Sequence, residues 1–173
     1  MSEFIFITGG ARSGKSSYAL KLAKQISTKN VAFIATAHPV DAEMKSRITR
    51  HKKERPEHWI TYENPESIPT LIEGLDDQFD VVIIDCITLF LSSLMCTAFE
   101  ESKIKTIISE ITDQIALFNG TSIIVSNEVG LGIVPNNELG RKFRDLTGTV
   151  NQYIAQKCNT AFFMVASLPM KLK

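Results

Sequence analysis

The segment FIFITGGARSGKS, residues 4–16, is the most informative part of this sequence for the fold. It begins as a short apolar run typical of a buried strand and continues into the pattern G-x-x-x-x-G-K-[ST]. Apolar residues at helical spacing follow from Tyr18 to Ile26. A strand, such a loop and a helix in this order form a P-loop, where backbone N–H groups and the helix N-terminus bind nucleotide phosphates. The alternative, a glycine-rich turn with an accidental Lys-Ser pair, does not explain the flanking strand and helix.

The loop is therefore the first predicted binding site for a nucleoside triphosphate. We expect Lys15 to reach the β- and γ-phosphate oxygens and to act in catalysis, and the Ser16 hydroxyl to bind Mg²⁺. The nucleotide-binding residues predicted from the motif are Gly9, Gly10, Ala11, Arg12, Ser13, Gly14, Lys15 and Ser16.

Outward from this loop, short β-rich runs alternate with longer helical patterns. Several runs are nearly all apolar, as in strands covered on both faces, and the intervals between them fit helical crossovers. The sequence therefore predicts an α/β fold of the P-loop NTPase type, with a mostly parallel central sheet flanked by helices in a RecA-like arrangement. The predicted strands are residues 3–8, 31–35, 80–85, 121–126 and 160–166, and the predicted helices after the first are residues 41–55, 100–118 and 138–156.

The strand-like segment FDVVIID, residues 79–85, ends in a carboxylate. A carboxylate at the end of a strand near a P-loop is suited to hold the magnesium shell, so Asp85 and Ser16 are the predicted metal-side residues. The alternative is that Asp85 caps the following segment, residues 87–95.

The composition is that of an ordinary soluble protein and predicts one domain, residues 1–173. Nineteen basic residues balance nineteen acidic ones, so no overall field would attract nucleic acid or an anionic membrane. No run reaches the ~20 apolar residues needed to span a bilayer, so no stable membrane insertion is expected. Cys86, Cys96 and Cys158 are widely spaced and odd in number, which favours reduced thiols and a cytoplasmic location.

The predicted helix 41–55 carries a basic stripe. Plotted at 3.6 residues per turn, the members of the stripe fall within about 100° of one another. They are Met44, Arg47, Ile48, His51 and Arg55. An anion could meet the imidazole and guanidinium groups together, but a solvated basic face with an incidental histidine explains the same pattern. His38, in a loop, and His58, beside Trp59, are weaker candidates.

Five segments together resemble a known family, the bifunctional adenosylcobinamide kinases and adenosylcobinamide-phosphate guanylyltransferases of cobalamin biosynthesis. They are TGGARSGKS (8–16), RITRHKKERPEHW (47–59), DCIT (85–88), NEVGLGIVP (127–135) and GTVNQ (148–152). Their spacing agrees over essentially the whole chain, and the second and fourth segments are the specific ones. The chain departs from the family at Leu168, where a glycine is expected, in a tail interpreted as structural.

The resemblance implies two successive transfers on one substrate. ATP or GTP phosphorylates the aminopropanol hydroxyl of adenosylcobinamide. GTP then guanylylates a histidine that falls on His51, and the phosphorylated cobinamide takes up GMP to give adenosylcobinamide-GDP. The resemblance also implies a homotrimer. Further nucleotide contacts implied by the resemblance fall on Ile34, Ala35, Thr36, Lys52, Lys53, Glu54, Arg55, Glu63 and Asp85.

Two other functions are compatible with the P-loop alone. A small-metabolite or nucleotide kinase would use His51 only as a phosphate ligand, and a regulator that senses nucleoside triphosphates would have no catalytic residues. Asn127 and Glu128 also allow two interpretations. They follow the fourth predicted strand, where open α/β sheets place ligand residues, or they form a turn before Gly130.

Overall fold

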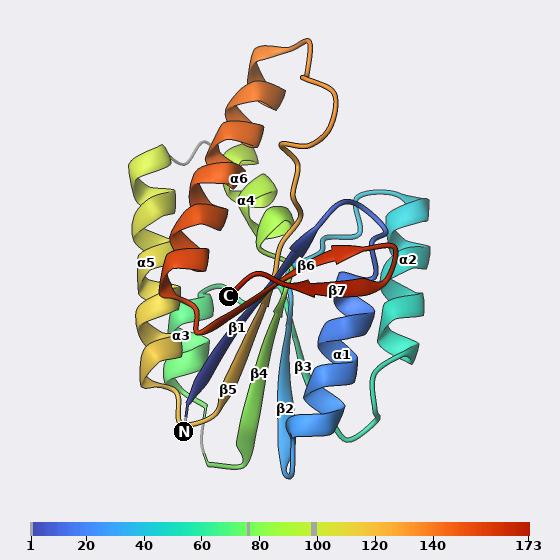
Figure 1. The fold of residues 1–173 in the computed structure, drawn as a ribbon, viewed down its shortest axis with the longest axis vertical. Coiled ribbons are helices and arrows are strands. Elements are labelled where there is room, and N and C mark those ends of the chain that lie inside the picture. The colour runs from blue at the N-terminus through green and yellow to red at the C-terminus, as the bar shows by residue number, and fades with distance from the viewer. Residues whose placement is uncertain (1, 76, 98–99) are drawn as a thin grey trace.

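The computed structural model describes residues 2–75, 77–97 and 100–173. Within them runs one seven-stranded sheet with the order β3-β2-β4-β5-β1-β6-β7 (Figure 1). Neighbouring strands are parallel except for β6 and β7, so the prediction of a mostly parallel sheet is confirmed. The strands are β1 (Glu3–Gly9), β2 (Asn30–Ala35), β3 (Ile60–Glu63), β4 (Phe79–Asp85), β5 (Thr121–Val125), β6 (Thr160–Val165) and β7 (Leu168–Lys171).

Helices cover both faces of the sheet, and α1 and α2 lie on the face opposite α3, α4, α5 and α6 (Figure 1). The side chains of β1 alternate between two cores: Phe4 and Phe6 pack with the four-helix face, whereas Ile5 and Ile7 pack with α1. Covering on both faces explains the continuous apolar runs of the inner strands. The helices are α1 (Lys15–Ile26), α2 (Ala42–Lys53), α3 (Ile68–Glu73), α4 (Ile87–Cys96), α5 (Glu101–Leu117) and α6 (Glu138–Lys157).

The two edge strands, β3 and β7, were not predicted from the sequence. β3 has only four residues and its side chains are half-buried or exposed, so it lacks the apolar run of an inner strand. β7 is exposed throughout and contains Pro169, which is tolerated in a strand only where its missing N–H is not needed, as at an edge. Edge strands therefore carry little of the pattern by which buried strands are recognised.

Helix α2 differs from the other helices because none of its residues is buried. Its start follows the prediction: the Asp41 carboxylate accepts a hydrogen bond of 2.7 Å from the Met44 amide and caps the helix. Its end comes at Lys53 rather than at the predicted Arg55. Pro56 gives the physical reason, because the residue before a proline is disfavoured in helical conformation.

Across the described residues, no helix combines the length and apolar character needed to cross a membrane.

Candidate active site

A cleft of about 850 Å³ lies at the edge of the sheet where the strands reach their carboxyl ends, between the P-loop and α2. Open α/β sheets place ligands at this edge because loops from several parallel strands converge there. The predicted site residues that line the cleft are Arg12, Ser13, Gly14, Lys15, Ser16, Ala35, His51, Lys52, Glu54, Arg55, Glu63 and Asp85. Segments far apart in sequence thus meet in one cavity.

The remaining predicted site residues lie beside the cleft or away from it. Gly9, Gly10 and Ala11 form the first half of the P-loop, and Ile34 is buried in the core. Thr36 is also buried, and its hydroxyl donates a hydrogen bond of 2.7 Å to the Cys86 carbonyl.

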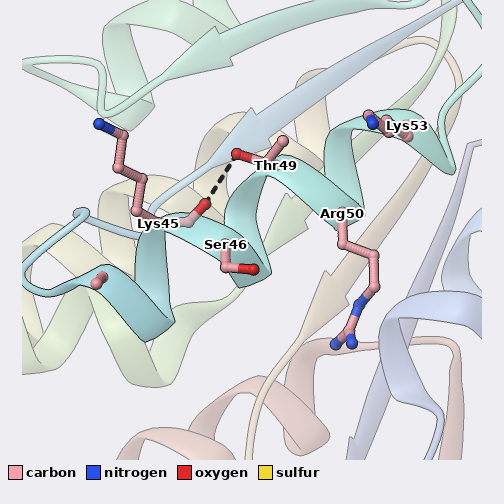
Figure 2. A pocket seen from close by; sticks show the side chains of 6 residues that line it. Lys45, Ser46, Thr49, Arg50 and Lys53 are labelled. Carbon is pink, nitrogen blue, oxygen red and sulfur yellow. Dashed lines mark hydrogen bonds between the residues drawn. The ribbon is translucent and has the colours of Figure 1, made fainter.

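Lys53 is a special case because it is exposed on α2 and does not line the cleft. There it lines a shallow hollow with Lys45, Ser46, Thr49 and Arg50 (Figure 2). The Thr49 hydroxyl donates to the Lys45 carbonyl at 2.9 Å along this surface, as Figure 2 shows. The structure therefore does not bring Lys53 together with the P-loop.

The P-loop is held in a conformation that depends on glycine. Gly14 has a φ of 91°, in the left-handed region, and a Cβ added there would lie 2.7 Å from the Ser167 hydroxyl oxygen. Ser167 belongs to the turn between β6 and β7, and its amide donates to the Ser13 carbonyl at 2.9 Å. Ser167 thus lines the cleft, and no local sequence pattern indicated it.

The Lys15 ammonium lies over this loop. It donates hydrogen bonds to the Gly10 carbonyl at 2.6 Å and to the Ser13 hydroxyl at 3.4 Å. Burial lowers the pKa of Lys15, and the negative charge of Asp85 acts in the opposite direction. A lysine held by carbonyl and hydroxyl oxygens at the start of a helix is placed to bind phosphate oxygens.

Asp85 faces the same loop from the end of β4. Burial raises the pKa of its carboxyl group, while a hydrogen bond from the Ser16 side chain and the charges of His51, Arg55 and Lys15 oppose this effect. The N-cap residue of α4 is Cys86, and no side chain donates or accepts a capping hydrogen bond there. The capping alternative for Asp85 is therefore wrong. Two oxygen ligands side by side, the Ser16 hydroxyl and the Asp85 carboxylate, fit a hard cation such as Mg²⁺.

The predicted stripe on α2 faces the cleft. Within the helix, only Met44, Ile48 and His51 are partly buried, and Arg47 lines the cleft from an exposed position. The His51 side chain is 24% exposed, and its Nδ1 atom lies 3.8 Å from a Glu54 carboxylate oxygen. His38 and His58 are exposed and do not line the cleft. His51 is therefore the histidine that the fold places opposite the P-loop.

Arg55, beyond the end of α2, turns inward. Its guanidinium carbon lies 3.7 Å from the centre of the Phe33 ring, and one guanidinium nitrogen donates to the Thr61 hydroxyl at 3.4 Å. Burial lowers the pKa of Arg55, and the charges of Asp85, Glu63 and Glu54 oppose that effect. Glu63 forms an ion pair of 2.5 Å with Lys52 at the rim. This end of the cleft offers paired charges for a polar ligand.

Asn127 and Glu128, which follow β5, have different roles in the structure. A Glu128 carboxylate oxygen accepts from the Gly130 amide at 3.0 Å, which is turn chemistry. The Glu128 amide donates to the Gly9 carbonyl at 2.9 Å and ties this segment to the P-loop. Asn127, in contrast, lines the cleft.

Comparison with known proteins gives matches over nearly the whole chain. The family model of cobinamide kinase / cobinamide phosphate guanyltransferase matches residues 5–172. The bifunctional adenosylcobalamin biosynthesis protein CobP of Pseudomonas aeruginosa is 39% identical over 167 residues, which cover 96% of this chain and 95% of that protein. The CobU proteins of Escherichia coli and Salmonella typhimurium are 36% and 35% identical, each over 98% of this chain and 99% of the relative.

Solved structures resemble the chain in fold. A KaiC-like protein from Pyrococcus horikoshii superposes with a TM-score of 0.56 at 14% identity, over 93% of this chain and 70% of that one. The RadB recombinase superposes with a TM-score of 0.55 at 15% identity, over 93% and 73% of the two chains. These likenesses confirm the RecA-like arrangement predicted from the sequence.

Proposed function

The chain belongs to the cobinamide kinase / cobinamide phosphate guanyltransferase family, and we propose that a single cleft, between the P-loop and α2, serves both reactions. The enzyme is a transferase of phosphoryl and nucleotidyl groups. One observation carries the proposal: Lys15, Asp85 and His51, from three separate elements, line the same cleft. We also propose adenosylcobinamide as the acceptor, a cytoplasmic location and the homotrimer expected from the family resemblance.

In the kinase reaction, ATP or GTP lies with its β- and γ-phosphates in the P-loop. Lys15 binds their oxygens, and the backbone N–H groups at the start of α1 stabilise the negative charge. The Ser16 hydroxyl and the Asp85 carboxylate would hold Mg²⁺, and the bound ion would neutralise negative charge on the phosphates. The aminopropanol hydroxyl of adenosylcobinamide attacks the γ-phosphorus, and the nucleoside diphosphate leaves.

In the guanylyl reaction, His51 is the nucleophile. An imidazole nitrogen attacks the α-phosphorus of GTP, a nitrogen–phosphorus bond forms, and the bond to pyrophosphate breaks. A phosphate oxygen of adenosylcobinamide phosphate then attacks the same phosphorus. This second displacement gives adenosylcobinamide-GDP and frees the histidine. The position of His51 on α2, across the cleft from the P-loop, supports a role at the α- rather than the γ-phosphate.

The test is to incubate the protein with GTP and Mg²⁺ and to measure its mass. We expect a gain of one GMP in the wild type and none in His51→Asn, which keeps hydrogen bonding but cannot form the covalent bond. His58→Asn is the matched control, since His58 is exposed and outside the cleft, and it should be labelled like the wild type. His51→Asn should still phosphorylate adenosylcobinamide, which a regulator without catalytic residues cannot do. Guanylylated protein in His51→Asn would show that the nucleophile is elsewhere.

A further inference from the structure

Strand β5 lies between the P-loop strand and the strand that ends in Asp85 (Figure 1). Its last residue, Val125, is in register with Ile7 of β1 on one side and with Asp85 of β4 on the other. Asn127 follows two residues later and is half-buried in the wall of the cleft. The chain thus leaves the sheet at a point between the phosphate loop and the metal-side carboxylate.

A network of buried polar side chains holds the backbone of Asn127 in place. The Asn127 amide donates to the Thr88 hydroxyl at 2.7 Å, and the Asn127 carbonyl accepts from the Asn151 side-chain amide at 3.1 Å. The Thr88 and Ser126 hydroxyl oxygens are 3.1 Å apart. Ser126 donates in turn to the Asn151 side-chain oxygen at 2.7 Å. Thr88, Ser126 and Asn151 are 4%, 0% and 6% exposed, so the network is buried between α4, β5 and α6.

The carboxamide of Asn127 takes no part in this network. It forms no hydrogen bond with any residue that the structure describes, although both backbone groups of the same residue are bonded. A rigid backbone thus presents a polar group to the cleft beside the P-loop. Because the backbone of Asn127 is already fixed, little free energy is needed to orient its side-chain amide during the reaction. A donor that stabilises a transition state requires this property.

We infer that the Asn127 amide nitrogen donates a hydrogen bond to the γ-phosphoryl group during its transfer to the acceptor hydroxyl, and that Thr88, Ser126 and Asn151 position it. This inference rests on the proposed function and adds a contact for its first reaction. Charge spreads over the equatorial oxygens of the phosphoryl group in the transition state, and a fixed N–H donor stabilises it there. The guanylyl reaction breaks the bond at the α-phosphorus and does not need this contact for its chemical step.

The first experiment compares the two reactions in Asn127→Ala. We expect kcat for phosphorylation of adenosylcobinamide to fall about 100-fold, as after removal of one donor to a developing oxyanion, with KM for the nucleotide changed far less. The rate of GMP attachment to the protein should stay within a few fold of wild type. Asn127→Asp should lose still more kinase activity, because a carboxylate repels the phosphate. Asn119→Ala, at an exposed position outside the cleft, is the matched control and should behave as wild type.

The second experiment tests the positioning network. Thr88→Val removes the hydroxyl that accepts from the Asn127 amide but keeps the shape of the side chain. We expect it to lower kcat for the kinase reaction at unchanged KM, whereas Thr88→Ser, which keeps the hydroxyl, should restore most of the activity. A merely structural role would lower kinase activity and GMP attachment together.

The outcomes separate this inference from the proposed function. Kinase turnover of Asn127→Ala and Asn127→Asp within twofold of an active wild type overturns the inference alone, and so does an equal loss of both reactions in folded variants. A wild type that does not phosphorylate adenosylcobinamide contradicts the proposed function instead. Circular dichroism of each variant confirms that it is folded, and the near-isosteric Asn127→Asp decides the result if the alanine variant is not.

Discussion

At the scale of single residues, the cleft brings together ionisable side chains whose charged forms are each disfavoured by burial. Burial raises the pKa of Asp85 and lowers the pKa values of Lys15 and Arg55, so each group is pushed toward its neutral form. The opposite charges of its neighbours act against this in each case. Buried charges of this kind contribute little to the stability of a protein, so we interpret the cluster as a binding site for a charged ligand.

Replacement of Asp85 by asparagine tests this balance. The pKa of Asp85 is raised in the folded state, so ionisation of its carboxyl group costs more free energy there than in the unfolded chain. The contribution of Asp85 to the free energy of unfolding therefore falls as pH rises from the ordinary aspartate pKa through the folded pKa. We expect the unfolding free energy of Asp85→Asn without nucleotide at pH 7 to equal or exceed that of wild type. The increase in melting temperature caused by GTP and Mg²⁺ should largely disappear, because a metal ligand is lost.

Asp113→Asn is the control for this comparison, since Asp113 is exposed on α5 and outside the cleft. It should keep the full stabilisation by GTP and Mg²⁺. A large fall in the melting temperature of nucleotide-free Asp85→Asn would mean that the carboxylate is structural.

At the scale of elements, α2 is held by its ends rather than by a core. Asp41 caps its start, and the Lys24 ammonium donates to the Glu54 carbonyl at its end, at 3.2 Å. The side of the helix that carries His51 borders a cleft instead of a core. The stripe could be predicted from helical spacing, but its partner could not, because an amphipathic pattern does not say what the face meets.

The turn from α1 into β2 depends on Asp80 of β4. Its carboxylate accepts four hydrogen bonds of 2.7–3.1 Å, from the Ser27 hydroxyl, the amide and hydroxyl of Thr28, and the Lys29 amide. Burial acts to raise the pKa of Asp80, but these hydrogen bonds outweigh it, and the pKa is lowered. A lowered pKa stabilises the fold above the ordinary aspartate pKa, and this contribution is lost as pH falls through the folded value.

Asp80→Asn should therefore lower the unfolding free energy at pH 7 by about 1–3 kcal/mol, since hydrogen bonds to a charged acceptor are replaced by weaker ones. The difference from wild type should shrink as the pH falls through the folded pKa, as measured by urea unfolding over a pH series. Asp77→Asn, an exposed neighbour, is the control and should change stability little. A difference that stays constant down to strong acid would contradict the assigned role of the charge.

At the scale of the whole molecule, the sheet divides the interior into two apolar cores, and two of the three cysteines lie inside them. Cys158 belongs to the core under α3 to α6 and Cys86 to the core under α1. Burial raises the pKa of Cys86 to about 12 and also raises the pKa of Cys158. All three cysteines are free thiols, as the sequence predicted, and Cys96 is exposed.

Alkylation of the native protein should therefore modify Cys96 first, because the reactive species is the exposed thiolate. We expect mass spectrometry after brief iodoacetamide treatment to find one added group in wild type and none in Cys96→Ser. Unfolding in urea should make all three thiols of the wild type react. Rapid modification of Cys86 or Cys158 in the native protein would contradict the burial of these two side chains.

Much of this architecture follows from local pattern. The P-loop, the five longer strands and the start of α2 could be read from the chain, because consecutive backbone groups bind phosphate and because buried strands need continuous apolar residues. The likeness of five motifs to the family likewise indicated the activity, which the comparisons support.

The contacts between distant segments, in contrast, could not be predicted from the sequence. Arg55 turns in against Phe33, Ser167 packs on the P-loop, and Asn151 reaches across from α6 to hold the backbone of Asn127. Each depends on how helices and strands pack, and no spacing along the chain encodes that. The edge strands β3 and β7 could not be predicted for a similar reason. They are recognised by their pairing with a neighbouring strand and not by an apolar run. A local motif indicates which backbone and side-chain groups can bind phosphate. Only the packing of helices and strands brings His51 and Asn127 into the same cleft as these groups.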